Sequence, residues 1–211
     1  KFTKMKPFLF LFFTINCLAS IGQEGFNGKI SWKIERGKET IFRDIYVKEN
    51  RVKVEEWNKL TPKNKSVIIL DLKRSVANII SYERKSYFVV SAKKKPLENI
   101  EFTFKTEEVD DLLGLKITKW KVDAYHLSRI SSYWFSASDF SFYKKMLLLL
   151  PELNYLEKQF LQLPLSEGVM PIKAEYSNIN NLQVTLMEVI KIEKMDLPVE
   201  IFQIPKGYKA F

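Results

Sequence analysis

The sequence has little of the residues from which most enzyme sites are built. Of its 211 residues, one is cysteine, one is histidine and seven are glycine. The single cysteine, Cys17, cannot form an internal disulfide, so a hydrophobic core must stabilise the fold. The single histidine, His126, cannot build a multi-histidine or Cys/His zinc site. The scattered glycines form no phosphate-binding loop, dinucleotide fingerprint or nucleophile elbow. These absences predict a protein that is not an enzyme and has no cofactor.

Two weaker arrangements of polar residues have to be weighed against that prediction. His126 follows Asp123 with serines nearby, but residues three apart lie on opposite faces of a strand, which disfavours a Ser–His–Asp site. Residues 107–111 are rich in acids but lack the alternating oxygen ligands of a calcium loop. We interpret the histidine as structural and the acids as a solvated helix start, and we expect no metal site.

The first 22 residues have the layout of a secretory signal peptide. Three lysines lie within the first six residues, an apolar run covers residues 7–18, and small residues follow. The run is shorter than the about 20 residues that a membrane span needs, which disfavours an uncleaved anchor. Cys17 lacks the preceding leucine and small residue of a lipoprotein signal. We therefore expect cleavage near Gly22-Gln23, export to the periplasm, and one domain over residues 23–211.

The charge balance is basic. The formal net charge is +9, and removal of the three N-terminal lysines would lower it to +6. In an exported protein this excess points to anionic membrane surfaces or envelope polymers, and not to nucleic acid. The lysines are dispersed, however, and the simpler interpretation of most of the charge is a solvated surface. The densest run, residues 93–95, is expected at a loop tip.

Most of the chain from residue 26 onward alternates between apolar and polar residues, which is typical of half-buried strands. In residues 182–194 this period of two continues without interruption. Residues 106–113 instead indicate a short helix that Gly114 stops, and the tail ending in Pro205, Gly207 and Tyr208 predicts a turn pinned by an aromatic ring. The expected strands cover residues 26–35, 40–48, 51–57, 67–72, 76–81, 86–92, 116–128, 130–136, 169–177 and 182–194.

One stretch, residues 139–163, predicts a long helix. Its leucines, methionine and aromatic residues crowd most of the helix surface, so little of it can face water. Asp139 is expected to cap the N-terminus, and Pro151 to kink or break the helix. About ten strands in one antiparallel sheet curl strongly, and a helical block this apolar would fill the concave side. The predicted fold class is α+β, a strongly curved antiparallel sheet with a helical block on its concave side.

Several short segments resemble one known group of proteins. They are Phe26-Asn27-Gly28, the hairpin at 45–54, Gly114-Leu115-Lys116 leading to Lys119-Trp120, Tyr133-Trp134-Phe135 before Asp139, residues 168–171, and the closing residues 202–208. Together they resemble an exported bacterial family of unknown function within the LolA/LolB-like lipoprotein-carrier superfamily. The resemblance implies a LolA-like half-barrel closed by helices, with an apolar hollow that receives lipoprotein acyl chains in such carriers.

The apolar residues of the strands and the helical stretch are the candidate lining of that hollow. The candidate ligand-binding residues are Trp32, Ile34, Trp120, Trp134, Phe142, Met146, Leu149 and Leu150. The first hypothesis is a periplasmic, non-enzymatic binding protein for a lipid or acylated ligand, with basic rim residues near anionic headgroups. The alternative is a cell-envelope structural or interaction module with a filled core and a protein partner. A hydrolase stays a third alternative, because the separation of its carboxylates cannot be judged from sequence.

Overall fold

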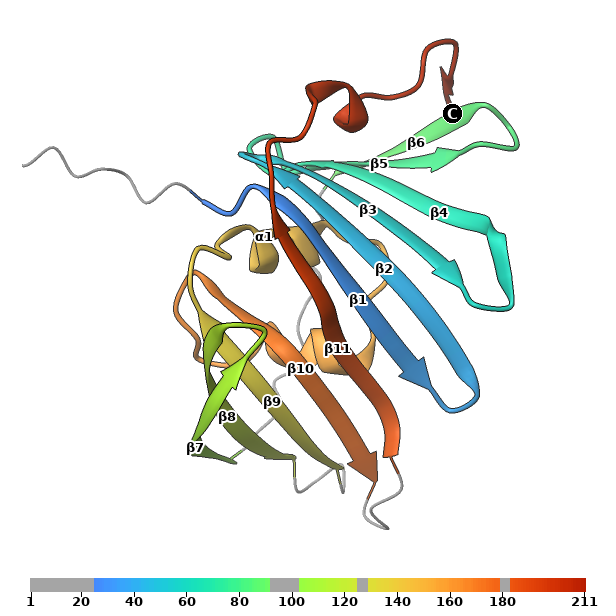
Figure 1. The fold of residues 1–211 in the computed structure, drawn as a ribbon. Helices are drawn as coiled ribbons and strands as arrows, with labels where there is room; N and C mark the ends of the chain where they lie inside the picture. The colour runs from blue at the N-terminus through green and yellow to red at the C-terminus, as the bar shows by residue number, and fades with distance from the viewer. Residues whose placement is uncertain (1–24, 92–102, 125–128, 179–182) are drawn as a thin grey trace, which may run out of the picture.

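The computed structural model describes residues 25–91, 103–124, 129–178 and 183–211 (Figure 1). Within them, 12 strands form one curved sheet in the order β12-β6-β5-β4-β3-β2-β1-β11-β10-β9-β8-β7. Neighbouring strands are antiparallel except for the parallel pair β12–β6. The strands are β1 (Gly28–Arg36), β2 (Glu39–Lys48), β3 (Arg51–Asn58), β4 (Thr61–Asp71), β5 (Val76–Ser81), β6 (Ser86–Ser91), β7 (Thr103–Leu112), β8 (Leu115–Ala124), β9 (Arg129–Ala137), β10 (Val169–Asn178), β11 (Gln183–Lys194) and β12 (Lys209–Ala210).

The alternation in the sequence decides which side chains the sheet buries. In β1, Ile30, Trp32 and Ile34 are buried, whereas Ser31 and Lys33 between them are half-buried. We call the sheet face that carries Ile30, Trp32 and Ile34 the inner face, and the opposite face the outer face. The prediction of a large, curved, mainly antiparallel sheet is confirmed.

Strand β11 changes phase within its length. Its register pairs Ile30 with Ile192 but Trp32 with Val189, so one residue is inserted between these two pairs. The inserted residue, Ile190, is 45% exposed, whereas Val189 is buried. Such a β-bulge exchanges the two faces of a strand. The uninterrupted period of two expected for this strand is therefore wrong.

The helix expected over residues 106–113 is also wrong. Residues 106–112 of this segment belong to β7, which forms an antiparallel hairpin with β8. The turn contains Leu113 with φ 54° and Gly114 with φ 72°. Two successive positive φ angles are typical of a two-residue hairpin turn, so Gly114 shapes a turn and does not stop a helix. Within the described residues β7 is an edge strand, where charged residues are favoured because they oppose pairing with other chains.

The stretch expected to be one long helix contains two short ones, α1 (Phe142–Leu149) and α2 (Tyr155–Phe160). The break expected at Pro151 is confirmed. Leu150, immediately before it, is extended, with φ −65° and ψ 135°. A residue before proline avoids the helical region because the proline ring clashes with it.

Asp139 does not cap α1, contrary to expectation. The N-cap residue is Ser141. The carbonyl oxygen of Asp139 instead accepts a hydrogen bond from Phe26 N at 3.0 Å, and its carboxylate pairs with Lys194 Nζ at 3.2 Å. These contacts attach the residues just before α1 to the residues that lead into β1 and to the end of β11.

Both helices pack against the inner face. Five of the eight residues of α1 are buried, and they join one hydrophobic cluster with residues of β1, β2, β9 and β10.

Among the helices of the described residues, none has the length and apolar character needed to cross a membrane.

The C-terminal segment forms a smaller hydrophobic cluster on the outer face. The segment contains the 3₁₀ helix η2 (Val199–Phe202) and ends with β12 beside β6. Ile204 and Tyr208 pack on Val67, Ile69 and Ile80 of β4 and β5. The Tyr208 amide donates to the Pro205 carbonyl oxygen at 3.2 Å, which confirms the expected aromatic-pinned turn.

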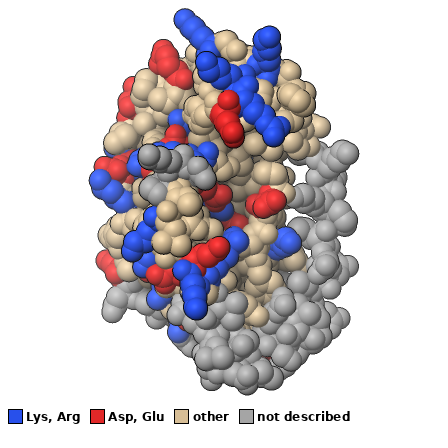
Figure 2. All heavy atoms as spheres, turned by 90° about the vertical axis from the view of Figure 1, so that its right-hand side faces the viewer, with Lys and Arg blue, Asp and Glu red and all other residues tan. Residues whose placement is uncertain are grey.

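Charged side chains of the outer face are paired with one another. Lys29 Nζ lies 2.8 Å from Asp44 Oδ2, and Lys53 Nζ lies 2.7 Å from Glu55 Oε1. On the molecular face drawn in Figure 2, basic side chains likewise lie beside acidic ones. Surface pairs of this kind contribute about 0–1 kcal/mol each, and they fit a solvated surface better than a single-sign binding patch.

Candidate functional site

The most apolar part of the structure lies between α1 and the inner face. Trp32 of β1 stacks on Tyr143 of α1, with ring centroids 6.0 Å apart and an interplanar angle of 17°. Met146 and Leu147, one turn further along α1, are completely buried. The alternation of β1 and the helical spacing of α1 thus bring two apolar surfaces together.

The structure brings most of the eight candidate lining residues together. Six are buried in the same cluster: Trp32, Ile34, Phe142, Met146, Leu149 and Leu150. Trp120 is half-buried at its margin and meets Phe135 edge-on, with centroids 5.6 Å apart. The six buried residues and Trp120 stay candidates for contact with a ligand.

Trp134, the eighth candidate, is also partly buried and packs against this cluster, but it takes the other phase of β9. Tyr133 and Phe135, its neighbours along β9, are buried on the inner face, so Trp134 points to the outer face. There its ring lies between two ammonium groups, with Lys119 Nζ 5.3 Å and Lys173 Nζ 4.7 Å from the ring centroid. Cations at this distance from a tryptophan ring are attracted by its π electrons.

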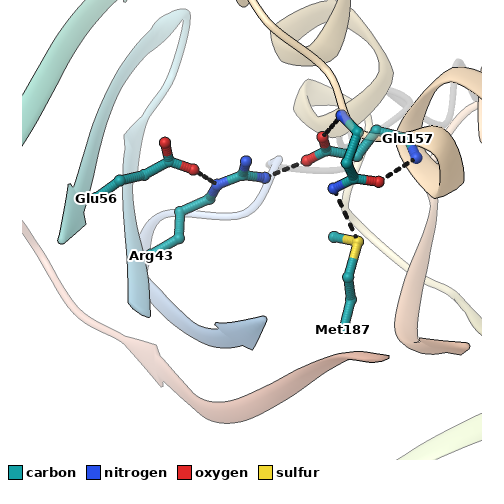
Figure 3. A network of polar contacts seen from close by, with 5 residues as sticks. Arg43, Glu56, Glu157 and Met187 are labelled. Carbon is teal, nitrogen blue, oxygen red and sulfur yellow. Dashed lines mark hydrogen bonds and ion pairs between the residues drawn. The ribbon is translucent and has the colours of Figure 1, made fainter. Parts of the chain in front are cut away.

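A buried charged network crosses from the sheet to α2 (Figure 3). Arg43 of β2 donates from Nε to Glu56 Oε1 of β3 at 2.5 Å, and from Nη1 to Glu157 Oε1 of α2. Arg43 is 4% exposed and Glu157 is 2% exposed, whereas the Glu56 side chain is 33% exposed. Burial alone would lower the pKa of Arg43, but the two carboxylates outweigh it and raise that pKa above its usual range. The guanidinium is therefore permanently charged.

Glu157 is positioned by the start of α2. Its amide donates to Asn154 Oδ1 at 3.0 Å, and its Oε2 accepts from the Asn154 amide at 2.8 Å. This reciprocal pair is a capping box, which satisfies two amides that the helix start leaves free. Asn154 Nδ2 also lies 3.2 Å from Met187 Sδ of β11. The cap thereby fixes the carboxylate that Arg43 binds.

Sequence reasoning missed this network, although two signals of it are present. Ile41, Arg43 and Ile45 share one phase of β2, so an arginine stands in an apolar row. Asn154 followed three residues later by Glu157 is a capping-box spacing. Neither signal indicates that Arg43 and Glu157 meet.

Two tyrosines add hydroxyl groups to the same interior. The Tyr133 hydroxyl lies 2.7 Å from Gln159 Oε1 and 3.0 Å from the Leu156 carbonyl oxygen, so it donates to α2. Burial raises the pKa of Tyr133 well above its usual value. Burial and, secondarily, the Glu157 carboxylate raise the pKa of Tyr143. Both phenols therefore stay protonated at physiological pH.

Three buried polar atoms of the described residues have no hydrogen-bond partner: Trp32 Nε1, Ser86 Oγ and Ser131 Oγ. Trp32 Nε1 is buried, and no acceptor lies within hydrogen-bonding distance of it in the described structure. Trp32 stands directly opposite Arg43 in the β1–β2 register, and both side chains lie on the inner face. A buried donor without an acceptor is uncommon, because most buried polar groups find a protein or water partner.

The buried carboxylate of the site is already engaged by neighbouring groups. Glu157, the buried carboxylate of the site, is held by Arg43 and by the helix cap, so it is poorly placed to accept a proton from a substrate. In the residues that the structure describes, no group of three or more His, Cys, Asp or Glu side chains could hold a metal ion. His126 lies outside the described residues.

Comparisons with known proteins place the fold and the family. The fold is similar to the crystal structure of an uncharacterized conserved protein from Thermus thermophilus, with a TM-score of 0.50, 8% sequence identity, and coverage of 87% of this chain and 88% of that chain. The crystal structure of MucB matches with a TM-score of 0.42 and 11% identity, over 88% of this chain and 59% of the MucB chain. No curated protein matches the sequence. At such low identity the Thermus match concerns the fold alone.

A family profile gives the assignment that the structures do not. The profile of the family described as a domain of unknown function (DUF4412) matches residues 26–208, which is most of the chain. The match does not name the LolA/LolB superfamily, so that part of the resemblance stays a prediction, with which the curved antiparallel sheet is consistent. The chain belongs to the DUF4412 family.

Proposed function

We propose that this protein is a non-enzymatic binding protein of the bacterial envelope, which takes the acyl chain of a lipid or acylated ligand between α1 and the inner face. The observation that supports the proposal best is the apolar interior itself, in which six candidate lining residues from β1, α1 and the residue after α1 meet. Met146 suits such a role, because its unbranched, flexible side chain repacks around ligands of varied shape.

The short helices supply the access that such a ligand needs. The helices α1 and α2 cover the concave side of the sheet in this proposal, and an acyl chain enters when α1 moves outward. Leu150 and Pro151 form an extended joint between the two helices, and α2 is held separately by Arg43. Movement of α1 therefore leaves the charged network in place.

A second candidate function, an interaction module with a filled core, has its own supporting observation. Val89 of β6 is 56% exposed and Phe211 is 81% exposed, and both lie near the edge of the sheet that β12 and β6 form. Exposed apolar residues at a sheet edge are typical of protein-binding surfaces. Under this alternative the interior binds nothing and a protein partner covers the edge.

The first test is extraction of the protein as purified from the envelope without detergent. A lipid recovered at about one molecule per chain, identified by mass spectrometry, is the expected result. The same sample gives the mature N-terminus, expected at Gln23 if the signal peptide is removed. Lipid-free protein that also binds no added acyl probe would favour the interaction module.

Filling the interior should abolish ligand binding. We expect Met146→Trp to lower the affinity for a fluorescent acyl probe at least tenfold, because a larger ring takes the space of a flexible, completely buried side chain. Leu148→Trp is the matched control, since Leu148 lies on the same helix and is 52% exposed. Thermal unfolding of both variants separates lost binding from lost folding. Equal probe affinity of the two variants would contradict the proposed place of the ligand.

A further inference from the structure

The unpartnered indole of Trp32 is a feature that packing alone leaves unexplained. An indole nitrogen can only donate, and this one is buried where bulk water cannot reach it. The Trp32 ring is held by its stack on Tyr143. Nε1 thus makes no hydrogen bond in the described structure, while the ring itself is held by this stack. A fixed, unsatisfied donor in an apolar interior is the arrangement expected of a group that binds one polar atom of an apolar ligand.

The surroundings of Trp32 restrict the charge of that polar atom. Arg43, its direct cross-strand neighbour, is already bound by the carboxylates of Glu56 and Glu157. One positive and two negative charges leave a net negative group beside Trp32. A further carboxylate or phosphate would be repelled there, most of all by Glu157, which is 2% exposed and little screened by water. An uncharged carbonyl oxygen can bind there without this repulsion.

We propose that Trp32 is a specificity-determining residue whose Nε1–H donates a hydrogen bond to the neutral carbonyl oxygen of an acyl ester or amide. The hydrocarbon part of that ligand occupies the interior between α1 and the inner face. This inference rests on the proposed function and sharpens it. It assigns the site to esterified or amidated acyl chains, and it disfavours free fatty acids and plain hydrocarbons.

The hydrogen bond can be observed directly in the indole N–H resonances of the four tryptophans. The resonance that disappears in Trp32→Phe belongs to Trp32. Addition of methyl laurate to the wild-type protein should shift this resonance downfield, as a new hydrogen bond does. Addition of dodecane should not. Trp57 and Trp134 serve as internal controls, because each is paired with lysine on the outer face and should not respond.

Affinities give the second readout. We expect the wild-type protein to bind methyl laurate about tenfold more tightly than dodecane or laurate, the preference that one hydrogen bond supports. In Trp32→Phe, which keeps an aromatic ring on Tyr143, the ratio of the methyl laurate and dodecane affinities should fall to about one. Trp57→Phe is the matched control, and its ratio should equal that of the wild-type protein.

The outcomes separate the two proposals. If the wild-type protein binds none of the three probes, the proposed function itself is wrong. If it binds methyl laurate and dodecane equally well, or if the Trp32 resonance does not move, only the role of Trp32 is wrong. Tighter binding of laurate than of methyl laurate would overturn the assignment to neutral carbonyls. The resonance measurement needs only folded wild-type protein, so a poorly folding Trp32→Phe variant would not prevent the test.

Discussion

Replacement of Arg43 by methionine should lower the free energy of unfolding by about 3–5 kcal/mol, the cost of leaving one partner of a buried ion pair without its counter-charge. Glu157 is 2% exposed and has no other cation on it among the described contacts, so its carboxylate would stay buried and unpaired. The cost of losing Arg43 is smaller at Glu56, because its side chain is 33% exposed and can be solvated. Denaturant unfolding followed by tryptophan fluorescence measures the loss.

Two further variants show whether the buried charge causes this loss. Adding Glu157→Gln to Arg43→Met removes the charge but keeps an oxygen for the helix cap, so we expect it to restore at least half of the stability. Arg74→Met is the matched control, since the Arg74 side chain is 83% exposed and lies 3.8 Å from Asp71. It should cost at most about 1 kcal/mol. A loss for Arg43→Met as small as that of Arg74→Met would show that the pair is not buried in solution.

Replacement of Gly28 by alanine should be the second most damaging change, with a loss of about 3 kcal/mol or more from steric overlap and backbone strain together. A Cβ atom at this position would lie 2.0 Å from the Glu193 carbonyl oxygen, and the backbone φ of 145° is one that other residues rarely adopt. The clash is with backbone, which cannot rotate away. Relief would require β1 and β11 to separate where they pair at the centre of the sheet.

Gly37→Ala is the control for this change. Gly37 also has a positive φ, of 55°, but no atom lies within 4 Å of its expected Cβ. It should therefore cost only about 1 kcal/mol, the penalty of the left-handed conformation alone. For a chain of this size, 1 kcal/mol corresponds to about 2–4 °C in the melting temperature, so differential scanning calorimetry resolves the two variants. Equal losses for both would contradict the close approach of β1 and β11.

Local patterns predicted those parts of the fold whose cause is local. The alternation of Ile30, Trp32 and Ile34 predicts a half-buried strand, because neighbouring side chains of a strand point to opposite faces wherever the strand lies. Pro151 predicts the end of α1, because its ring acts on the adjacent residue. The apolar helical stretch likewise predicts burial of Met146 and Leu149 whatever they pack against.

The candidate site was predicted only in part, for a related reason. Alternation cannot say which phase of a strand faces the helices when both phases carry aromatic residues. Tyr133, Trp134 and Phe135 are such a run, and the structure buries the first and third and leaves Trp134 beside two lysines. The bulge at Ile190 is comparable, because it depends on the register with β1 and not on the sequence of β11 alone.

Composition and local pattern were enough to establish the strand-rich class, the apolar helical insertion with its break, the shortage of catalytic residue types and the apolar character of the interior. Three features required the folded chain: β7 is a strand, β1 lies beside β11, and Arg43 meets Glu157 across 114 residues of chain. The difference arises because hydrophobic period and backbone preference act over a few residues. Strand pairing and ion pairing depend on which distant segments the folded chain brings into contact.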